Sequence, residues 1–286
     1  MKNYGLTPHK LGDQIVLDGI EAINNVQYEN NLPGFISGGM AISSYLPNEN
    51  YRETIDLDYT LFFGGNVADY KRITEPLVKT LTEKGYFVEY KKKDTTHDYF
   101  IKSHEDSFLI QHSRRSPNNF IKNKKSLERE INNRRVISNK NKNLSYAVLS
   151  PEDLVIHKLN RVLKFHTAYN VSFPKNISQE DFKKQIEFLK EEVLNLKDSV
   201  TPKMVAKLRL FYDIFDIKSL GKSVGLNKIY FEEALKDWVN HDIMENNFRE
   251  TLDKYEIRLT PAEAEVFLSS LSDLFLGIIT KNKTVS

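Results

Sequence analysis

Two acidic residues separated by one position, Asp56 and Asp58, have the most distinctive spacing for chemistry in this sequence. They lie in the run IDLDY, residues 55–59, whose alternation is typical of a β-strand. Side chains two positions apart on a strand point to the same face of a sheet, so both carboxylates should share one face. Two aligned carboxylates can hold a divalent metal ion.

The elements that must position this pair begin upstream, at the apolar residues Phe35 and Ile36. They lead into Ser37-Gly38-Gly39, where a strand should pass into a helix beginning near Met40. Because glycine has no Cβ, the backbone N–H groups of this turn can approach an anion closely. A triphosphate is an anion of this kind.

The combination of these motifs resembles a known family. Gly-Gly at a strand-to-helix turn, followed by Arg52-x-Thr54 and then Asp56-x-Asp58, resembles the first motif of the polymerase-beta-type nucleotidyltransferases. Within that superfamily the chain looks most like the AbiEii-type toxin branch, whose second half is helical. The order of the motifs along strand, turn, helix and strand makes the combination more specific than either short pair alone.

Two segments of the second half continue the resemblance. SPEDLVIHKLNR, which contains Lys158 and Arg161, is similar to the second motif of the family, and RLFYDI, residues 209–214 with Arg209 and Asp213, is similar to the third. Leu210 stands where the third motif commonly has an acid. The resemblance implies catalytic roles for Lys158 and Asp213 and supporting roles for Arg161 and Arg209. By position alone, Lys158 could be a surface lysine, and Asp213 a surface acid or the structural partner of Lys158.

The resemblance also implies the reaction. Asp56 and Asp58 would bind Mg²⁺ (or Mn²⁺), and a nucleotidyl group would pass from an NTP to a hydroxyl acceptor with release of pyrophosphate. Asp56, Asp58, Lys158 and Asp213 are the expected catalytic residues. The expected nucleotide-binding residues are Ser37, Gly38, Gly39, Arg52, Thr54 and Arg161. A plain edge-strand role remains open for Arg52 and Thr54.

Sites of this type commonly take a third carboxylate from a neighbouring strand, and the strand-like run at residues 107–112 contains no acid. Gln111 or His112 stands there instead. Glu105 and Asp106, which precede this run, are interpreted as turn residues first and as metal ligands only second. Two hypotheses follow, an active nucleotidyltransferase or a catalytically weak binding or regulatory protein of the same fold.

The composition limits the class of protein. The 286 residues are 40% hydrophobic and 28% charged, which is typical of a globular protein of one large domain or two ordinary ones. The absence of cysteine excludes disulfides, thiolate nucleophiles and cysteine-ligated zinc. The first residues lack the apolar core of a signal peptide, and no run reaches the roughly 20 apolar residues of a membrane span. We expect a cytoplasmic protein with no membrane partner.

The periodicity of apolar residues predicts an α+β fold. A mixed sheet with flanking helices should occupy residues 1–147, and a helical domain contributing to the active-site cleft should occupy residues 148–286. Helices are predicted at residues 12–25, 67–84, 177–196, 201–220, 227–240 and 260–281 and from residue 151. Further strands are predicted at residues 86–90, 99–102 and 108–112, and residues 147–149 should end another.

A basic segment joins the two halves. Between Arg114 and Lys142 there are ten lysine and arginine residues, Arg114, Arg115, Lys122, Lys124, Lys125, Arg129, Arg134, Arg135, Lys140 and Lys142, against two acids, Glu128 and Glu130. Beside a nucleotide site this charge favours RNA (tRNA-like) as the acceptor, and a protein hydroxyl is the other candidate. The alternative without a functional role is an ordinary solvated surface. The family resemblance implies the toxin-like component of a toxin–antitoxin system, with a possible cognate antitoxin.

Overall fold

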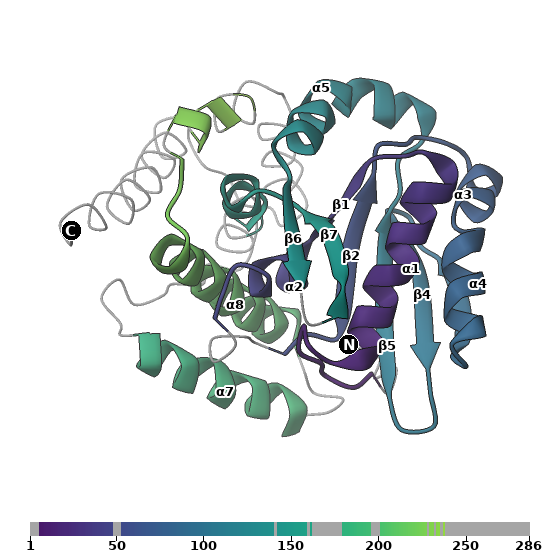
Figure 1. Cartoon of the computed structure of the whole chain (residues 1–286). Coiled ribbons are helices and arrows are strands. Elements are labelled where there is room, and N and C mark those ends of the chain that lie inside the picture. Colours follow the sequence, from purple (N-terminus) through teal and green to yellow (C-terminus); the bar gives the residue numbers. More distant parts are fainter. Residues whose placement is uncertain are drawn as a thin grey trace. The chain divides into compact units, whose positions relative to one another are not determined.

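The computed structural model describes residues 6–47, 53–139, 142–158, 161, 179–195, 201–227, 229–231, 233, 234 and 237 (Figure 1). The chain forms two compact units, Met1–Ser150 and Pro151–Ser286. Arg52, Trp238, His166 and the helix predicted at residues 260–281 lie outside the described residues. No helix in the described part of the chain is both long and apolar enough to cross a membrane.

The first unit is built on a sheet of seven strands in the order β3-β4-β5-β2-β1-β7-β6. The strands are β1 Gly34–Ser37, β2 Asp56–Leu61, β3 Phe87–Lys92, β4 Thr96–Lys102, β5 Ser107–Ser113, β6 Arg135–Asn139 and β7 Leu144–Val148. β1 pairs with β7 and β2 pairs with β5 in parallel, whereas the other neighbours are antiparallel. The sheet is therefore mixed, and with its flanking helices and the helical second unit it confirms the α+β fold class.

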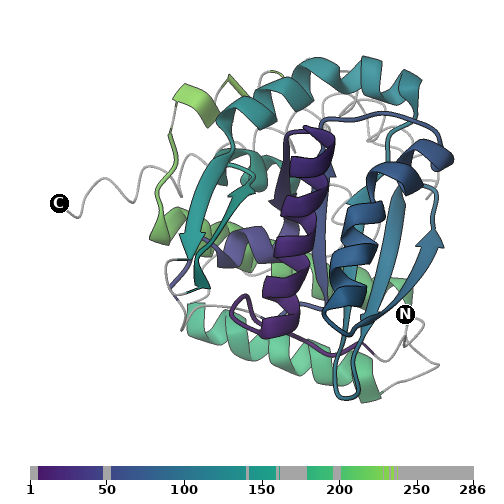
Figure 2. The same cartoon turned by 45° about the vertical axis from the view of Figure 1, so that its right-hand side comes forward.

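Helix α1, Gln14–Asn30, and helix α4, Glu75–Glu83, run side by side over one face of this sheet (Figures 1 and 2). A Cβ at Gly19 of α1 would meet the side chains of Ile110 and Leu57, so the helix approaches the strands closely there. Helix α1 is longer than predicted. Its last residue is Asn30, and the capping residue Asn31 has a φ of 50°, the left-handed conformation that asparagine accepts at helix ends.

The helix predicted over residues 67–84 is two helices, α3 Val67–Ile73 and α4 Glu75–Glu83, so that prediction was wrong. The break lies at Thr74, where the hydroxyl donates to the carbonyl of Tyr70 at 2.6 Å. Pro76 has no N–H, which is tolerated only in a first helical turn, so a new helix begins there.

The helix-covered face of the sheet carries a buried group of aromatic and histidine side chains. His112 of β5 stacks on Tyr59 of β2 with ring centroids 4.4 Å apart. Tyr70 of α3 stacks on His97 of β4 at 4.7 Å and meets His112 edge-on at 5.0 Å. Tyr99, also on β4, donates a hydrogen bond of 2.6 Å to the hydroxyl of Thr74, whose own hydrogen goes to Tyr70. These contacts fix α3 to the sheet.

The basic segment contains helix α5, Pro117–Asn133, and edge strand β6. Helix α5 begins with Ser116 as its N-cap, because the hydroxyl accepts from the Asn119 amide at 3.3 Å. Lys122, Lys124 and Lys125 are exposed on it. The prediction from sequence did not include β6.

The second unit is helical. Residues 151–158 form a helix, and α7 Gln179–Asn195 packs against α8 Pro202–Ser223. The start predicted at Thr201 is confirmed, since its hydroxyl accepts from the Met204 amide at 3.3 Å. The phenol of Tyr230 donates to Asp153 at 2.5 Å, which ties the segment after α8 to the helix at residues 151–158.

Candidate active site

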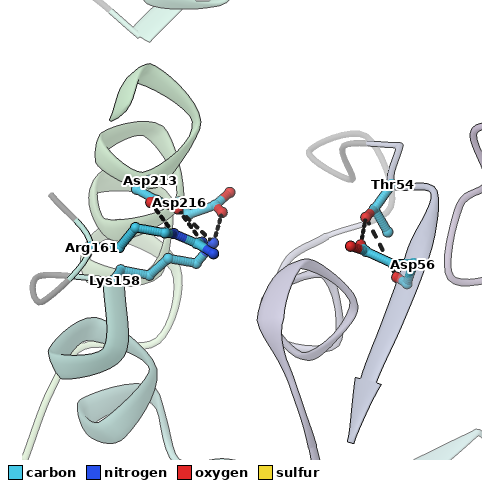
Figure 3. Close-up of polar contacts among 6 residues, drawn as sticks. All are labelled: Thr54, Asp56, Lys158, Arg161, Asp213 and Asp216. Carbon is cyan, nitrogen blue, oxygen red and sulfur yellow. Dashed lines mark hydrogen bonds and ion pairs between the residues drawn. The ribbon is translucent and has the colours of Figure 1, made fainter. Parts of the chain in front are cut away.

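Asp56 and Asp58 occupy alternate positions of β2 and therefore share one face of the sheet. Both are half-buried. The Oδ1 atom of Asp56 accepts a hydrogen bond of 2.6 Å from the hydroxyl of Thr54 (Figure 3). The backbone of Thr54 is fixed in turn by His9, because each residue donates its amide to the carbonyl of the other, at 2.9 and 2.8 Å. Thr54 thus orients the carboxylate of Asp56.

Gly38 brings the backbone against the second carboxylate. Ser37, the last residue of β1, is the register partner of Asp58, and Gly38 follows with a φ of +68°. A Cβ at Gly38 would lie 2.1 Å from the Oδ2 atom of Asp58, so any other residue would be strained in this conformation and would displace this carboxylate. The sequence predicted a helix start near Met40, and this was wrong by two residues. Helix α2, Gly38–Ser43, begins at Gly38. Gly39 is buried in its first turn.

The register of β5 decides between the two residues expected in place of a third acid. Asp58 pairs with Gln111, whereas His112 pairs with Tyr59. Neighbouring residues on a strand point to opposite faces, so Gln111 lies on the carboxylate face and His112 on the helix-covered face. His112 was therefore wrong as a candidate for this position. Among the described residues, no group of three or more His, Cys, Asp or Glu side chains could hold a metal ion.

The donor atoms that remain fit a hard divalent cation. Asp56 and Asp58 offer carboxylate oxygens and Gln111 offers an amide oxygen, all from one face of the sheet. Mg²⁺ and Mn²⁺ prefer oxygen ligands and keep waters of their own, so they do not need a complete protein cage.

The predicted residues of the second unit form an ion-pair cluster. Lys158 Nζ donates to Asp213 Oδ1 at 2.9 Å and to Asp216 Oδ2 at 2.7 Å, and all three side chains are buried (Figure 3). Arg161 donates through two of its nitrogens to the two oxygens of Asp213, at 2.5 and 2.6 Å. Two cations and two carboxylates thus balance each other, and Lys158 is not a surface lysine.

The two cations of the cluster differ in their exposure to solvent. The side chain of Lys158 is 3% exposed and that of Arg161 is 44% exposed. A phosphate that met Lys158 would compete with two carboxylates for its ammonium group, whereas Arg161 reaches solvent. The expectation that Asp213 holds Lys158 in place agrees with this geometry. Arg209 lies exposed on α8.

Two acids, one in each unit, contact predicted residues and were missed from the sequence. Asp216 lies three positions after Asp213, and this spacing puts both on one side of a helix, so the signal was present. Asp98 is buried on β4 and is the register partner of Gln111. The strand there was predicted to begin at Tyr99, so Asp98 was left outside it.

The histidines of the helix-covered face cannot supply positive charge near neutral pH. Burial lowers the pKa of His97 to about 4, with a smaller contribution from Arg114. Burial also lowers the pKa of His112 well below its ordinary value. Both rings are therefore neutral near pH 7 and act as packing groups.

Two solved structures resemble the chain over most of its length. One is the crystal structure of an antigenic nucleotidyltransferase-like protein from Paracoccidioides brasiliensis. The match covers 85% of this chain and 95% of that protein's chain, with 13% identity and a TM-score of 0.43. The solution structure of the antibiotic-resistance factor ANT(2'')-Ia covers 83% of this chain and 98% of its own, with 14% identity and a TM-score of 0.35. No protein-family model matches the chain, and no curated protein matches it significantly in sequence.

Proposed function

We propose that this protein is a metal-dependent nucleotidyltransferase, which moves a nucleotidyl group from an NTP to a hydroxyl acceptor and releases pyrophosphate. One observation carries the proposal. Asp56 and Asp58 share a face of the sheet at the point where the left-handed turn at Gly38 brings the backbone against Asp58. Paired carboxylates beside a glycine turn suit a metal-bound triphosphate.

Each residue of the sheet unit has a role in this proposal. Asp56 and Asp58 would hold Mg²⁺ or Mn²⁺, and Thr54 fixes the orientation of Asp56. Ser37, Gly38 and Gly39 would face the phosphates through backbone groups. When bound, the metal neutralises phosphate charge and aligns the attacking and leaving oxygens. Arg52, outside the described residues, is kept as a proposed triphosphate contact.

The helical unit is proposed to contribute charge to the same reaction. The guanidinium of Arg161 is the group best suited to contact a phosphate, because its side chain is 44% exposed and its two hydrogen bonds to Asp213 hold it in one orientation. Asp213 and Lys158 would support it, and the ion pairs of the cluster hold Lys158 in place. Positioning and electrostatics of this kind supply most of the catalysis in phosphoryl chemistry.

The acceptor is proposed to be RNA, with a protein hydroxyl as the other outcome. The exposed lysines of α5 offer phosphate contacts that position a strand without reading its bases. Reversing Lys124, Lys125, Arg134 and Arg135 to glutamate should weaken RNA binding and flatten its salt dependence, since each phosphate contact contributes about 0.7–0.9 to the slope of log affinity against log salt. Salt-independent RNA binding, or labelling of protein bands alone, would contradict an RNA acceptor.

A role as the toxin-like partner of an antitoxin belongs to this proposal as well. Growth of a bacterial host that expresses the chain is a direct measurement. The wild-type chain should slow growth, and Asp58→Asn should not. An equally toxic Asp58→Asn chain would contradict a toxicity that depends on nucleotidyl transfer.

A second candidate function is a catalytically weak binding or regulatory protein on the same fold. Gln111 favours it, because a neutral amide stands beside Asp58 where related sites commonly have a third carboxylate. Such a protein would bind NTP and metal without turnover.

The test is transfer of label from each of the four NTPs to total RNA or to lysate protein, with Mg²⁺ and with a chelator. Label should transfer only with the metal, and Asp56→Asn and Asp58→Asn should each abolish it with little change in melting temperature. Glu105→Gln, an exposed acid in the β4–β5 turn, is the matched control and should keep full activity. Wild-type turnover in either aspartate variant would refute the metal site, and binding of NTP without transfer would support the second candidate.

A further inference from the structure

Four side chains form a row across the centre of the carboxylate face. Ser37 of β1 pairs with Asp58 of β2, Asp58 pairs with Gln111 of β5, and Gln111 pairs with Asp98 of β4. Register partners on adjacent strands project from the same face of a sheet. The two acids of this row therefore flank Gln111, one on each side.

Asp98 is fully engaged by other side chains. It is buried, and its Oδ1 atom accepts from the Thr96 hydroxyl at 2.7 Å and from Gln111 Nε2 at 3.1 Å. Its Oδ2 atom forms an ion pair with Lys93. A carboxylate with both oxygens occupied in this way orients its neighbours and is not available as a metal ligand.

These contacts fix the orientation of the Gln111 amide. A carboxylate only accepts hydrogen bonds, so Gln111 must turn its NH₂ group toward Asp98. The carbonyl oxygen Oε1 then points away from Asp98, and within the described part of the chain it accepts no hydrogen bond. Gln111 lies between Asp98 and Asp58 in the strand register, so the side of the amide away from Asp98 is the side of Asp58.

We propose that Gln111 supplies the third oxygen of the metal site, through Oε1, and that Asp98 is the positioning residue that holds the amide in this orientation. The inference rests on the proposed metal site of Asp56 and Asp58. Amide oxygens are ordinary ligands of hard cations. A neutral third ligand leaves the site with two negative charges instead of three, which lowers its affinity for the free cation and its repulsion of a triphosphate.

The test measures Mn²⁺ binding to the full chain by calorimetry, without nucleotide, so that it does not depend on turnover. Gln111→Ala should weaken binding about 10-fold, the scale of losses seen when one supporting group of a metal site is removed. Gln111→Glu should bind Mn²⁺ more tightly than the wild type and gain more in melting temperature when Mn²⁺ is added. Glu105→Gln should match the wild type.

The role of Asp98 needs a readout that a purely structural residue would not change. Asp98→Asn offers Gln111 an amide that can both donate and accept, so the orientation of Gln111 is no longer fixed. Mn²⁺ affinity should fall several-fold in the wild-type background and stay unchanged when Asp98→Asn is added to Gln111→Ala. An equal loss in both backgrounds would overturn the positioning role of Asp98.

The failures of the two proposals are distinguishable through Asp58→Asn. If Asp58→Asn loses Mn²⁺ binding and both Gln111 variants bind as the wild type does, the role of Gln111 is refuted and the proposed site stands. If Asp58→Asn binds Mn²⁺ normally, the proposed metal site itself is refuted. The Gln111 variants decide the question even if Asp98→Asn does not fold.

Discussion

The two faces of the central sheet carry different polar side chains: carboxylates and an amide on one, and buried aromatic and histidine rings on the other. The two kinds of side chain alternate along the same strands. On β2 and β5, Asp58 and Gln111 belong to the carboxylate face, and their neighbours Tyr59 and His112 belong to the helix-covered face. The first pair is half-buried and offers oxygen atoms. The second pair is fully buried and stacked.

Unpaired polar atoms are tolerated on the buried face. Among the described residues, the hydroxyl of Tyr59, both ring nitrogens of His112 and Nε2 of His97 are buried without a hydrogen-bond partner. Each such atom costs free energy, which the packing of large rings must exceed. The helix-covered face therefore serves stability, and the carboxylate face is available for chemistry. Substitutions of adjacent residues on one strand should accordingly change stability in one case and activity in the other.

The largest expected effect comes from Gly38→Ala. The new Cβ would lie 2.1 Å from Asp58 Oδ2, so the carboxylate must move, and transfer activity should fall about 100-fold, as a displacement of about 1 Å in a reacting site commonly does. The left-handed conformation adds about 1–2 kcal/mol of strain. Activity and urea unfolding should be measured together.

Gly85→Ala is the matched control, because Gly85 also has a positive φ, +87°, and nothing lies within 4 Å of a Cβ placed there. It should lose stability to a similar extent and keep its activity. If both variants lost activity equally, strain and not displacement of Asp58 would be the cause.

A smaller effect is expected on the pH dependence of stability, which the buried histidines of the helix-covered face influence. The folded-state pKa values of His97 and His112 lie below the ordinary value, so between about pH 6.5 and about pH 4 the unfolded chain binds protons that the folded chain does not. The free energy of unfolding should therefore fall as the pH falls through this window. His112→Phe keeps the stacked ring and removes one titrating group, so its loss between pH 7 and pH 5 should be smaller by about 1–2 kcal/mol.

Exposed His104 provides the comparison for this pH experiment. His104→Gln should leave the dependence of urea midpoint on pH unchanged. A His112→Phe curve parallel to that of the wild type would show that the ring of His112 does not contribute to acid sensitivity.

The smallest effect should be a gain. Tyr59→Phe removes a buried hydroxyl without a partner and should raise the free energy of unfolding by about 1 kcal/mol. Tyr99→Phe makes the same chemical change at a hydroxyl that pairs with Thr74 at 2.6 Å, and it should lower stability by a similar amount. Thermal melts of the two variants should shift in opposite directions; shifts of one sign would contradict the distinction.

Local patterns predicted the parts of the fold that depend on neighbours in the chain. The alternation around Asp56 and Asp58 placed both on one face, because the period of a strand is a property of its own sequence. The break at Thr74 was missed because the apolar spacing continues across it. Strand β6 was missed because an exposed edge strand with Arg135 and Ser138 lacks a clear apolar alternation.

Contacts between distant segments could not be predicted in this way. Gln111 faces Asp58 and not the aromatic face only because β2 and β5 pair in one particular register, and a slip of one residue would have exchanged it with His112. The same dependence on register hid the role of Asp98. Lys158 and Asp213 were identified as a pair through motifs, but their burial follows from packing that the sequence does not display.

The cluster of Lys158, Arg161, Asp213 and Asp216 has a consequence for how such a sequence can change over evolutionary time. Loss of Lys158 alone would remove the cation that bridges the buried carboxylates of Asp213 and Asp216, and loss of Asp213 alone would leave Lys158 and Arg161 without the group that they share. Breaking a buried ion pair from one side costs about 3–5 kcal/mol, which is a large part of the stability of a typical domain. Viable descendants should therefore replace these four residues together or retain them together, so the cluster constrains inheritance as a single character.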